Sequence, residues 1–586
     1  MPRSCFAAAD VNGDGELSFE ELCKCMQKMN AELGIGDFTD RHVEHYMQRF
    51  DIDGDKLLNP EEFLELYRTL LMVKLEEVEP ADFSRNMFIG RRKGKVEDDY
   101  RVSGIMGVGS FGVVRKVLCR NTGTTRVMKV VDKQKALSGG YPLKLIMEEI
   151  DKLRTLDHPA VLRLFEYCAD ERNLYLITDL LPGGDLLDAV EGSYNKKRYL
   201  QEPWVRDVFR QVSEGVAYCH AKGVMHKDLK LENIMLASFD PPEAVVIDVG
   251  LAELFPVSEA DSFRSADPAG TLATMAPEVI RGSFNAKCDV WSLGCCLYAL
   301  LCRRPLRLED NVRGEGGKDT VELYDYFYPF TPPPDESRQE LKAYLVRQKE
   351  GPDFSRLQCS DEAKDLLAQL LIFDRDPRPP MRQVLSHHWV QISKANGTIS
   401  REQMDSLLQF HRINPLAQAV LLDLSSQLPL KQLREMISLF ESMDKDGNGM
   451  LDEAELAEAL KLAGMGEENA RAAACRLAKG SGGFVEFSRF VAALAPSTAL
   501  LEDDELLRSS FNRLDANGDG YVSRSELQRL LERGARPVST PEEDVAPERV
   551  RRASQTARQA FDAISGEGRL RITFESFRRH LGDFVA

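Results

Sequence analysis

The sequence has no excess of positive charge and no framework of paired cysteines. It contains 94 acidic and 76 basic residues, which give a net charge of −18. Because binding to nucleic acid requires a basic face, this balance argues against a nucleic-acid partner. The twelve cysteines are not regularly spaced, and Cys295, Cys296 and Cys302 lie in a run typical of a buried helix. We therefore expect reduced thiols in a cytoplasmic protein.

Long hydrophobic runs are also missing. The longest run, from Val290 to Cys302, is too short to span a bilayer. No signal peptide opens the sequence, and Pro2 excludes N-myristoylation if Met1 is the true start. These absences predict a cytoplasmic location without a stable membrane anchor.

The length of 586 residues predicts three or four domains, and changes along the chain suggest their limits. Acidic loops alternate with helical stretches at both ends, so the chain contains an internal repeat interrupted by a central domain. The middle starts with strand-like patches and continues as mostly helical sequence. The expected parts are 1–80, a basic linker at 81–99, the central domain at 100–390, a connector at 391–430, and 431–586.

Four windows in the repeats match a twelve-residue calcium loop. Such a loop supplies oxygen ligands at positions 1, 3, 5, 7, 9 and 12, and glycine at position 6 permits the sharp turn. Each window also has an apolar residue at position 8, and four such matches favour EF-hand calcium sites over solvated turns. The expected ligands are Asp10, Asn12, Asp14, Glu16 and Glu21; Asp51, Asp53, Asp55 and Glu62; Asp444, Asp446, Asn448, Met450 and Glu455; and Asp515, Asn517, Asp519, Tyr521 and Glu526.

Three windows depart from the full pattern. The second has Lys56 at position 6, where a left-handed residue other than glycine costs about 1 kcal/mol, so weaker binding is expected. Residues 478–489 and 565–576 keep the frame but lose ligands, with Arg489 and Ser576 at position 12. Because EF-hands normally pair, these two windows are expected to be structural partners of the third and fourth loops.

The central domain carries the parts that phosphoryl transfer requires: a phosphate cradle, metal-binding carboxylates and a residue that orients the attacking hydroxyl. A G-x-G-x-x-G pattern alone is a weak signal, but here a strand follows it, which favours a kinase over a dinucleotide-binding fold. Lys129 follows Gly112 by seventeen residues and matches the lysine that neutralises the α- and β-phosphates of ATP; Glu149, or alternatively Glu148, would pair with it. The glycine-rich stretch comprises Gly107, Val108, Gly109, Ser110, Phe111, Gly112 and Val114.

The segment from His226 to Asn233 matches a kinase catalytic loop. Asp228 would accept the proton of the substrate hydroxyl, and Lys230 would steady the γ-phosphate. Asn233 and Asp248 would hold magnesium. A lysine two residues after the aspartate is the form found in Ser/Thr kinases. Further on, Glu278 is expected to pair with Arg378, and Asp289 is expected to anchor the backbone of the catalytic loop.

Residues 100–390 resemble the eukaryotic protein kinase domain of the calcium/calmodulin-dependent group. With the EF-hands, the chain resembles a calcium-dependent protein kinase of the plant and protist type, with an additional N-terminal EF-hand pair. The resemblance implies an α+β bilobal protein kinase domain flanked by all-α EF-hand domains. It also implies a calcium-activated Ser/Thr kinase that uses ATP, Mg²⁺ and Ca²⁺, with its own EF-hands in place of calmodulin. Thr178 would be the gatekeeper of the ATP pocket.

Two other classes of protein are weighed against an active kinase. A calcium-responsive scaffold with a catalytically weak kinase domain is the main alternative, but pseudokinases usually lose the equivalents of Lys129, Asp228 or Asp248, and all three are present. A simple calcium buffer rarely carries a kinase-sized enzyme. Calcium-dependent transfer of phosphate from ATP to a basic peptide would separate these classes.

Two departures from the family pattern concern the activation segment. Lys227 replaces the arginine that normally grips a phosphorylated activation loop, which argues against control by loop phosphorylation. Glu259, Asp261 and Asp267 could supply fixed negative charges instead. Val249 replaces the usual phenylalanine of the magnesium-binding triplet and could loosen the switch between inactive and active forms.

Two finer expectations concern substrates and regulation. Asp185 and Glu232 match positions that hold upstream arginines of substrates in basophilic relatives, although Asp185 could instead bond the ATP ribose. The connector resembles the autoinhibitory junction of the family. Its apolar stripe after Pro415 is expected to cover the substrate face at low calcium and to be captured by the EF-hands at high calcium. The alternative is a linker helix packed on the EF-hands at all times. The stripe consists of Leu416, Val420 and Leu424, with Ile413 just ahead.

Overall fold

A computed structural model gives the fold of the chain. Two compact units are present, one within residues 1–82 and one from residue 83 onward. The structure describes residues 6, 9, 12, 14–33, 43, 47, 57–60, 62–64, 66, 85, 88, 89, 91, 92, 96–109, 112–138, 143–249, 252–255, 263–266, 269–313, 319–392, 399–410, 415–478, 483–494, 504–534, 557, 558, 561 and 571–583.

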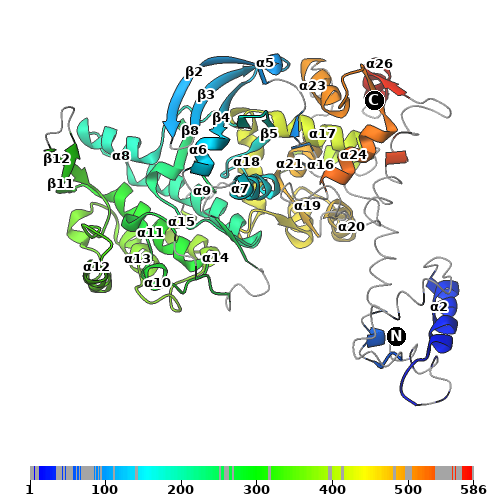
Figure 1. The fold of residues 1–586 in the computed structure, drawn as a ribbon, viewed down its shortest axis with the longest axis horizontal. Coiled ribbons are helices and arrows are strands. Elements are labelled where there is room, and N and C mark those ends of the chain that lie inside the picture. Colours follow the sequence, from blue (N-terminus) through cyan, green and yellow to red (C-terminus); the bar gives the residue numbers. More distant parts are fainter. Residues whose placement is uncertain are drawn as a thin grey trace. The chain divides into compact units, whose positions relative to one another are not determined.

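A six-stranded sheet forms the first lobe of the larger unit, seen in blue and cyan in Figure 1. Its order is β1-β5-β6-β4-β3-β2, and all neighbours are antiparallel except β1 and β5. Helix α7 packs in the core of this lobe through Ile146, Ile150 and Leu153. The elements are β1 (Arg91–Arg92), β2 (Tyr100–Gly109), β3 (Gly112–Cys119), β4 (Thr125–Asp132), α6 (Lys133–Ser138), α7 (Leu143–Thr155), β5 (Leu164–Ala169) and β6 (Asn173–Thr178).

The second lobe is mostly helical and surrounds α11 (Lys287–Leu301). Every residue of this helix from Cys288 to Leu301 is buried, which confirms the buried helix expected at Val290–Cys302. The other helices are α8 (Leu186–Asn195), α9 (Glu202–Ala221), α10 (Pro277–Ile280), α12 (Arg338–Glu350), α13 (Asp361–Leu370), α14 (Met381–Leu385) and α15 (His388–Gln391), with 3₁₀ turns η2 (Leu231–Asn233), η4 (Leu272–Thr274) and η5 (Phe354–Arg356). The strands are β7 (Val224–Met225), β8 (Ile234–Phe239), β9 (Pro242–Val246), β10 (Glu253–Leu254), β11 (Leu306–Arg313) and β12 (Asp319–Tyr326).

The connector and the C-terminal EF-hands pack as helices beside the two lobes, in yellow and orange in Figure 1. The expected pairing of intact and degenerate loops is confirmed, because β13 pairs with β14 and β15 with β16. The helices are α16 (Arg401–Phe410), α17 (Pro415–Gln427), α18 (Arg434–Met443), α19 (Glu453–Leu462), α20 (Glu467–Ala478), α21 (Phe487–Leu494), α23 (Asp504–Leu514), α24 (Arg524–Gly534) and α26 (Phe574–Asp583), with the 3₁₀ turn η6 (Leu430–Leu433). The strands are β13 (Leu451–Asp452), β14 (Phe484–Val485), β15 (Tyr521–Ser523) and β16 (Arg571–Thr573).

The N-terminal unit has the same EF-hand pairing. Leu17 and Leu58, each at position 8 of its loop, exchange two backbone hydrogen bonds of 2.9 Å. Helix α2 (Phe19–Leu33) leaves the first loop, and Leu22 and Met26 on it are fully buried. Phe6 and Phe63 pack edge to face with their ring centres 5.4 Å apart. The described residues between Phe6 and Leu66 therefore have the pairing and the packing of two EF-hands.

The segment expected to be a basic linker at 81–99 is packed on the kinase lobes where it is described. Arg85 is buried and donates to the carbonyl oxygens of Leu156 at 3.1 Å and Leu164 at 2.7 Å. Ile89 belongs to the core around α7, β1 adds to the sheet, and the short helix α5 (Val96–Asp99) precedes β2. The compact unit therefore begins near residue 83 rather than at Tyr100.

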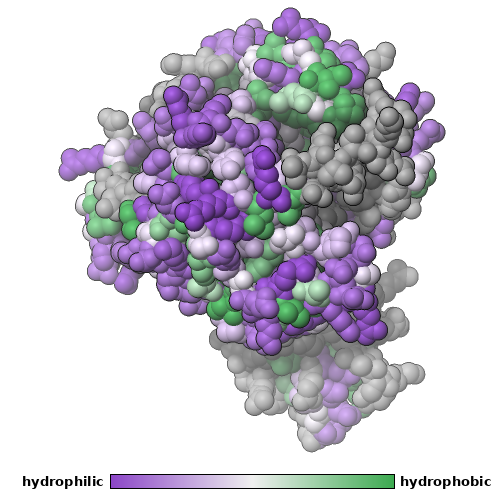
Figure 2. Space-filling view, turned by 90° about the vertical axis from the view of Figure 1, so that its left-hand side faces the viewer, coloured by the Kyte–Doolittle hydropathy of each residue, from purple (hydrophilic) through white to green (hydrophobic). Residues whose placement is uncertain are grey.

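The surface on the left of Figure 1 faces the viewer in Figure 2. It is largely hydrophilic, with a hydrophobic patch in its upper part. Strand β2 carries a row of exposed apolar side chains, namely Val102, Ile105, Met106 and Val108, of which Val108 is 79% exposed. No helix in the described segments is long and apolar enough to cross a bilayer.

Candidate active site and calcium sites

The carboxylate of Asp228 lies at the centre of a polar network. Thr271 Oγ1 donates to Asp228 Oδ1 at 2.7 Å, and Lys230 Nζ lies 3.0 Å from Asp228 Oδ2. Asn233 Nδ2 donates to the backbone oxygen of Asp228 at 2.8 Å and to its Oδ2 at 3.1 Å. The sequence motifs predicted Asp228, Lys230 and Asn233 together but missed Thr271. The only available signal was its place in the short stretch before Ala276-Pro277-Glu278.

The catalytic loop is held by a buried aspartate in the first turn of α11. Asp289 accepts from the backbone nitrogens of His226 and Lys227, both at 2.9 Å, and its Oδ2 lies 2.8 Å from His220 Nε2. Burial by itself would raise the pKa of Asp289, but the hydrogen bond and charge of His220 outweigh it, so that pKa lies below its usual value. The expected anchoring by Asp289 is confirmed.

Two residues next to the chemistry adopt backbone conformations that cost free energy. Lys227 has φ 72° and Asp248 has φ 61°, in the left-handed region that side chains rarely adopt. The neighbouring Val249 is buried in the core with Ile150 and Leu153 of α7. The surrounding contacts therefore fix a conformation that the local sequence would not choose.

The lysine and glutamate expected to form an ion pair do so. Lys129 Nζ on β4 lies 3.4 Å from Glu149 Oε1 on α7, whereas Glu148 faces Lys144 at 3.9 Å. Opposite Lys129 on the sheet is Val114 on β3, near the glycine-rich turn. A Cβ at Gly112 would lie 1.7 Å from the carbonyl oxygen of Val130, so only glycine allows β3 and β4 to approach this closely. The glycine-rich hairpin thus lies against the strand that carries Lys129.

A glutamate that sequence reasoning missed pairs with Lys227. Glu253 on β10 lies 3.0 Å from Lys227 Nζ, whose side chain is buried, and Ser265 Oγ donates to the same carboxylate at 2.6 Å. Strand β10 pairs with β7, which leads into the catalytic loop. Glu259, Asp261 and Asp267, the acids expected near Lys227, lie outside the described residues. The tertiary structure therefore places a fixed negative charge on Lys227 from the start of the activation segment.

The end of the activation segment is fixed by a buried bidentate ion pair. Arg378 Nη1 and Nη2 lie 2.5 Å and 3.1 Å from the two carboxylate oxygens of Glu278. Such paired contacts are stronger and more directional than a single hydrogen bond. The expected pairing of Glu278 with Arg378 is confirmed.

Acidic side chains gather beside the catalytic loop. Asp185 caps α8 by accepting from the backbone nitrogen of Asp188 at 2.8 Å. Burial and the nearby charges of Asp188 and Glu232 raise the pKa of Asp185. Burial and the charges of Asp188 and Asp185 likewise raise the pKa of Glu191. Glu232 accepts from the hydroxyl of Tyr328 at 3.2 Å. This accumulation of like charge favours a cationic partner.

The third and fourth calcium loops are built alike. Asp444, at position 1, accepts from the backbone nitrogens of Gly447 at 2.7 Å and Gly449 at 2.8 Å. Asp515 accepts from Gly518 and Gly520, both at 2.8 Å. The position-12 residues Glu455 and Glu526 each turn back toward the start of their own loop.

The donor set of the third loop fits calcium. Oxygens of Asp444, Asp446 and Glu455 lie within 4.8 Å of one another, and hard oxygen ligands are those calcium prefers. Burial, together with the charges of Glu455 and Asp446, raises the pKa of Asp444 to about 7. A bound divalent cation would relieve this repulsion.

Only part of the first and second calcium loops lies within the described residues. In the first loop, Asn12 Oδ1 accepts from the backbone nitrogen of Asp14 at 2.9 Å, and Glu21 accepts from Ser18. In the second, Glu62 accepts from the backbone nitrogen of Asn59 at 3.1 Å. Glu16 is described, and its backbone nitrogen donates to Asp14 Oδ1 at 3.0 Å. Six expected residues of these loops and of the glycine-rich turn lie outside the described residues: Asp10, Asp51, Asp53, Asp55, Ser110 and Phe111.

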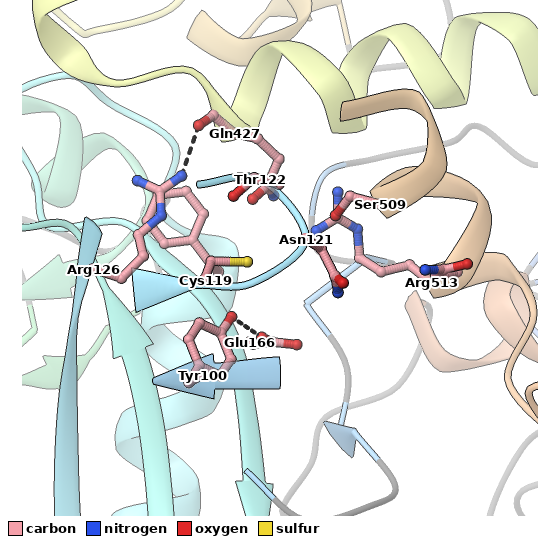
Figure 3. Close-up of a pocket in the computed structure, with 11 residues that line it drawn as sticks. Tyr100, Cys119, Asn121, Thr122, Arg126, Glu166, Gln427, Ser509 and Arg513 are labelled. Carbon is pink, nitrogen blue, oxygen red and sulfur yellow. Dashed lines mark hydrogen bonds between the residues drawn. The ribbon is translucent and has the colours of Figure 1, made fainter. Parts of the chain in front are cut away.

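The connector contacts the hinge between the two kinase lobes. Pro415 begins α17, as expected, and α17 packs on α21 and α23 of the EF-hands. At its C-terminal end, Arg126 donates to the carbonyl oxygen of Gln427 at 2.7 Å, as Figure 3 shows. Arg163 donates to Leu428 O at 3.1 Å and forms two 2.8 Å bonds with Asp179, the residue after Thr178. Thr178 ends β6 and is buried.

The fold and this site define a protein kinase that carries EF-hand calcium sensors in the same chain. A protein kinase domain model matches residues 100–390, an EF-hand domain pair matches 3–68, and an EF hand model matches 436–461 and 507–531. The chain is 30% identical over 472 residues to Calcium-dependent protein kinase 4 of Plasmodium berghei (strain Anka), covering 76% of this chain and 82% of that protein. The protein of the same name from Plasmodium falciparum (isolate 3D7) gives the same values. Calcium-dependent protein kinase 5 of Plasmodium falciparum is 27% identical over 447 residues, covering 75% and 72%.

The chain therefore belongs to the calcium-dependent protein kinase family. It is a calcium-activated Ser/Thr protein kinase that uses ATP and Mg²⁺, acts on protein substrates and carries its own EF-hands.

Proposed function

We propose that Asp228, Lys230, Asn233 and Asp248 perform the transfer of the γ-phosphate to a Ser or Thr hydroxyl. The observation that carries this proposal is the polar network on Asp228. Thr271 and Lys230 orient its carboxylate, and Asp289 fixes the backbone beside it. Asp228 then accepts the proton of the substrate hydroxyl, and Lys230 steadies the transferred phosphate. Positioning and charge stabilisation of this kind supply most of the catalysis in kinases.

Nucleotide and magnesium binding are assigned to the remaining residues of the site. The glycine-rich residues would cradle the phosphates, and Lys129, held by Glu149, would neutralise them. Asn233 and Asp248 would hold magnesium, since amide and carboxylate oxygens are the hard ligands that it takes. Magnesium supplies charge neutralisation on the phosphates when bound.

Two substitutions test this assignment. Asp228→Asn and Lys129→Met are expected to abolish phosphate transfer while leaving the circular dichroism spectrum unchanged. Asp361→Asn, at a fully exposed carboxylate on α13, is the matched control for Asp228→Asn and should keep activity. An Asp228→Asn enzyme that retains more than about a tenth of the wild-type rate would contradict the assignment, given that catalytic groups of this kind contribute at least a hundredfold.

We also propose that the connector inhibits the kinase at low calcium. Val420 and Leu424 are fully buried where α17 packs on the EF-hands, as expected of a captured segment. The same packing fits a permanent linker helix. Arg126 and Arg163 bind Asp179 at the hinge and also bind the carbonyl oxygens at the end of α17. Because α17 packs on the EF-hands, these contacts would also let the EF-hands act on the hinge directly. The described hydrogen bonds between α17 and the kinase lie beside the hinge, at Arg126 and Arg163, and none reaches Asp228 or Lys230.

A cleavage experiment separates these alternatives in the intact protein. A specific protease site is placed in residues 393–398 and cut at low calcium after purification, and the fragment that carries the connector is then separated from the kinase. If the connector inhibits, cutting releases calcium-independent activity. If the cut protein stays inactive while the uncut protein still responds to calcium, the EF-hands activate by supporting the catalytic domain, and the inhibitory model fails.

A preference for basic residues ahead of the target hydroxyl is proposed for the substrates. The acids Asp185, Asp188, Glu191 and Glu232 support this preference, because burial and the neighbouring negative charges raise the pKa values of Asp185 and Glu191, and a cationic partner would offset this repulsion. Arginine should be favoured over lysine because it bonds carboxylates in pairs. A peptide library with Glu232→Gln as the variant and Asp361→Asn as the control tests the idea. Equal use of basic and neutral peptides by the wild type would reject it.

Thr178 is proposed as the gatekeeper of the nucleotide pocket. Its small side chain at the end of β6 should admit inhibitors with a moderate hydrophobic group. Such inhibitors are expected to bind wild type more tightly than Thr178→Met. Equal affinity for both proteins would show that another residue has this role.

The remaining assignments concern domain limits and location. We propose the divisions 1–80, 81–99, 100–390, 391–430 and 431–586, with the described part of 81–99 packed on the kinase domain. A cytoplasmic location is proposed from the sequence, because the twelve cysteines are not regularly spaced, as is typical of proteins whose thiols stay reduced. Cell fractionation tests the location.

A further inference from the structure

The third calcium loop lies directly against the helical lobe of the kinase. A Cβ at Gly449, position 6 of the loop, would lie 2.6 Å from Tyr218 Cβ and 2.8 Å from His158 Cδ2. Tyr218 is on α9, and His158 precedes β5. His158 is buried and neutral, since burial lowers its pKa to about 3. The turn that shapes the calcium site is therefore also a contact surface.

The residues on either side of Gly449 make further contacts with the kinase. Met450, at position 7, is 7% exposed and belongs to the same hydrophobic core as Tyr218 and Val224. Gly447 approaches Leu385 of α14, because a Cβ there would lie 2.6 Å from Leu385 Cδ1. Arg382, also on α14, places Nη2 2.5 Å from Oδ2 of Asp446, an expected calcium ligand.

The helix that enters the loop, α18, is held by ion pairs to the same lobe. Arg210 on α9 bridges Glu214 on its own helix and Glu441 on α18, both at 2.8 Å. Arg434 on α18 pairs with Glu243 on β9. On the partner loop, the backbone nitrogen and hydroxyl of Ser488 donate to Asp157 at 3.0 Å and 2.6 Å. The contact thus includes residues of both EF-hands of the pair, with most of the described contacts on the third loop and α18.

The fourth loop provides an internal comparison. Gly518 and Gly520 occupy the positions of Gly447 and Gly449 and have similar positive φ angles, yet a Cβ at either meets no atom of the described residues within 4 Å. Tyr521, the counterpart of Met450, is 38% exposed. Two loops with the same internal hydrogen bonds therefore differ in what covers them.

We propose that the third calcium loop is the docking surface through which the C-terminal EF-hands hold the helical lobe, and that calcium binding to this loop and docking reinforce each other. The physical link is the loop backbone, since the same turn of Gly447 to Met450 forms the ion site and contacts Tyr218 and Leu385. Reciprocity follows from thermodynamic linkage: if calcium orders the shape that docks, docking raises the affinity of this loop for calcium. The inference rests on calcium binding by the third loop.

Hydrogen exchange in the full-length protein tests the link without relying on activity. The variants are Glu455→Gln and Glu526→Gln, which remove the position-12 carboxylate of the third and fourth loops. Calcium is expected to slow exchange at residues 216–222 of the wild type and of Glu526→Gln, and to lose this effect in Glu455→Gln. The link would be overturned by protection that is independent of calcium in the wild type, or by equal responses of the two variants.

A matched pair of glycines tests the reciprocal effect. Gly449→Ala and Gly520→Ala introduce the same methyl group at position 6, and calorimetry measures calcium binding in chains whose other three loops carry Gln at position 12. The third loop should lose about fivefold more affinity than the fourth, the lower end of coupling typical of linked sites. Equal losses would overturn the docking proposal. No calcium binding by the unsubstituted third loop would refute the calcium site itself.

Discussion

The third and fourth calcium loops share a design and differ in their surroundings. In both, the position-1 aspartate accepts from the backbone nitrogens of two glycines, and the position-12 glutamate closes the loop. The third loop is covered by the kinase, whereas a Cβ added at Gly518 or Gly520 of the fourth would meet none of the described residues within 4 Å. An intact ligand pattern therefore does not reveal whether a loop acts only as an ion site or also as a contact.

The fourth EF-hand is attached through its entering helix instead. Arg513 on α23, two residues before Asp515, forms bonds of 2.7 Å and 3.0 Å with Asp423 of α17. Asp423 is fully buried. Arg513 and Ser509 also line a small pocket with Tyr100 and Arg126 of the kinase, shown in Figure 3. Calcium in the fourth loop would thus act on the connector and hinge, and calcium in the third on the helical lobe.

The largest effect is expected at the helix contact of the fourth EF-hand. Arg513→Ala leaves Asp423 as an uncompensated buried charge, which typically costs about 3 kcal/mol. Urea unfolding of the full chain measures this loss, and Asp423→Asn added to Arg513→Ala should recover part of it. If Arg513→Ala lowers the free energy of unfolding by less than about 1 kcal/mol, the fourth EF-hand is attached mainly through other residues.

The next largest change in the free energy of unfolding is expected at position 7 of the third and fourth loops. Met450→Ala removes a buried side chain from the kinase core and should lower the free energy of unfolding by about 2 kcal/mol or more. Tyr521→Ala, at the exposed counterpart, should change it by about 0.5 kcal/mol or less. Both variants keep the backbone carbonyl that position 7 of an EF-hand loop is expected to offer to calcium. Similar losses at the two positions would remove the basis for the comparison.

Adding one methyl group at position 4 compares the surroundings of the third and fourth loops more directly. Gly447→Ala and Gly518→Ala share the cost of a left-handed alanine, about 1 kcal/mol. Gly447→Ala also meets Leu385, so it should cost about 1 kcal/mol more. Thermal unfolding of the two variants side by side measures the difference, which should disappear when Leu385→Ala is present in both.

The smallest effect is expected for the ion pair at the edge of the docking surface. The side chain of Arg382 is 67% exposed, so Arg382→Ala should lower stability by about 0.5 kcal/mol or less. Raising the salt concentration should shrink this difference, because exposed pairs are screened. Lys364→Ala, at an exposed pair within α13, is the matched control. A larger effect that persists in high salt would mean that Arg382 acts through packing.

Contiguous motifs made much of the architecture and site predictable. The calcium loops, the glycine-rich stretch and the segment from His226 to Asn233 each place their chemistry within a dozen residues, so spacing alone identifies them. The pairs Lys129–Glu149 and Glu278–Arg378 followed from the family resemblance and are present. Thr271 and Glu253 escaped prediction because no short pattern links them to Asp228 or Lys227.

The sequence by itself determined the order of domains, the kinase and EF-hand folds, and the residues that form each local motif. These features depend on ligand spacing, glycine positions and hydrophobic periodicity, which are written along the chain. Only the tertiary structure decided that Glu253 faces Lys227, that Arg85 is buried and bonds the carbonyl oxygens of Leu156 and Leu164, and that the third loop rather than the fourth contacts Tyr218. Those contacts join residues from 26 to more than 200 positions apart, such as Lys227–Glu253 and Arg210–Glu441. They form because whole helices and strands pack to bury apolar surface, and the local pattern of a calcium loop contains nothing about the surface against which it will lie.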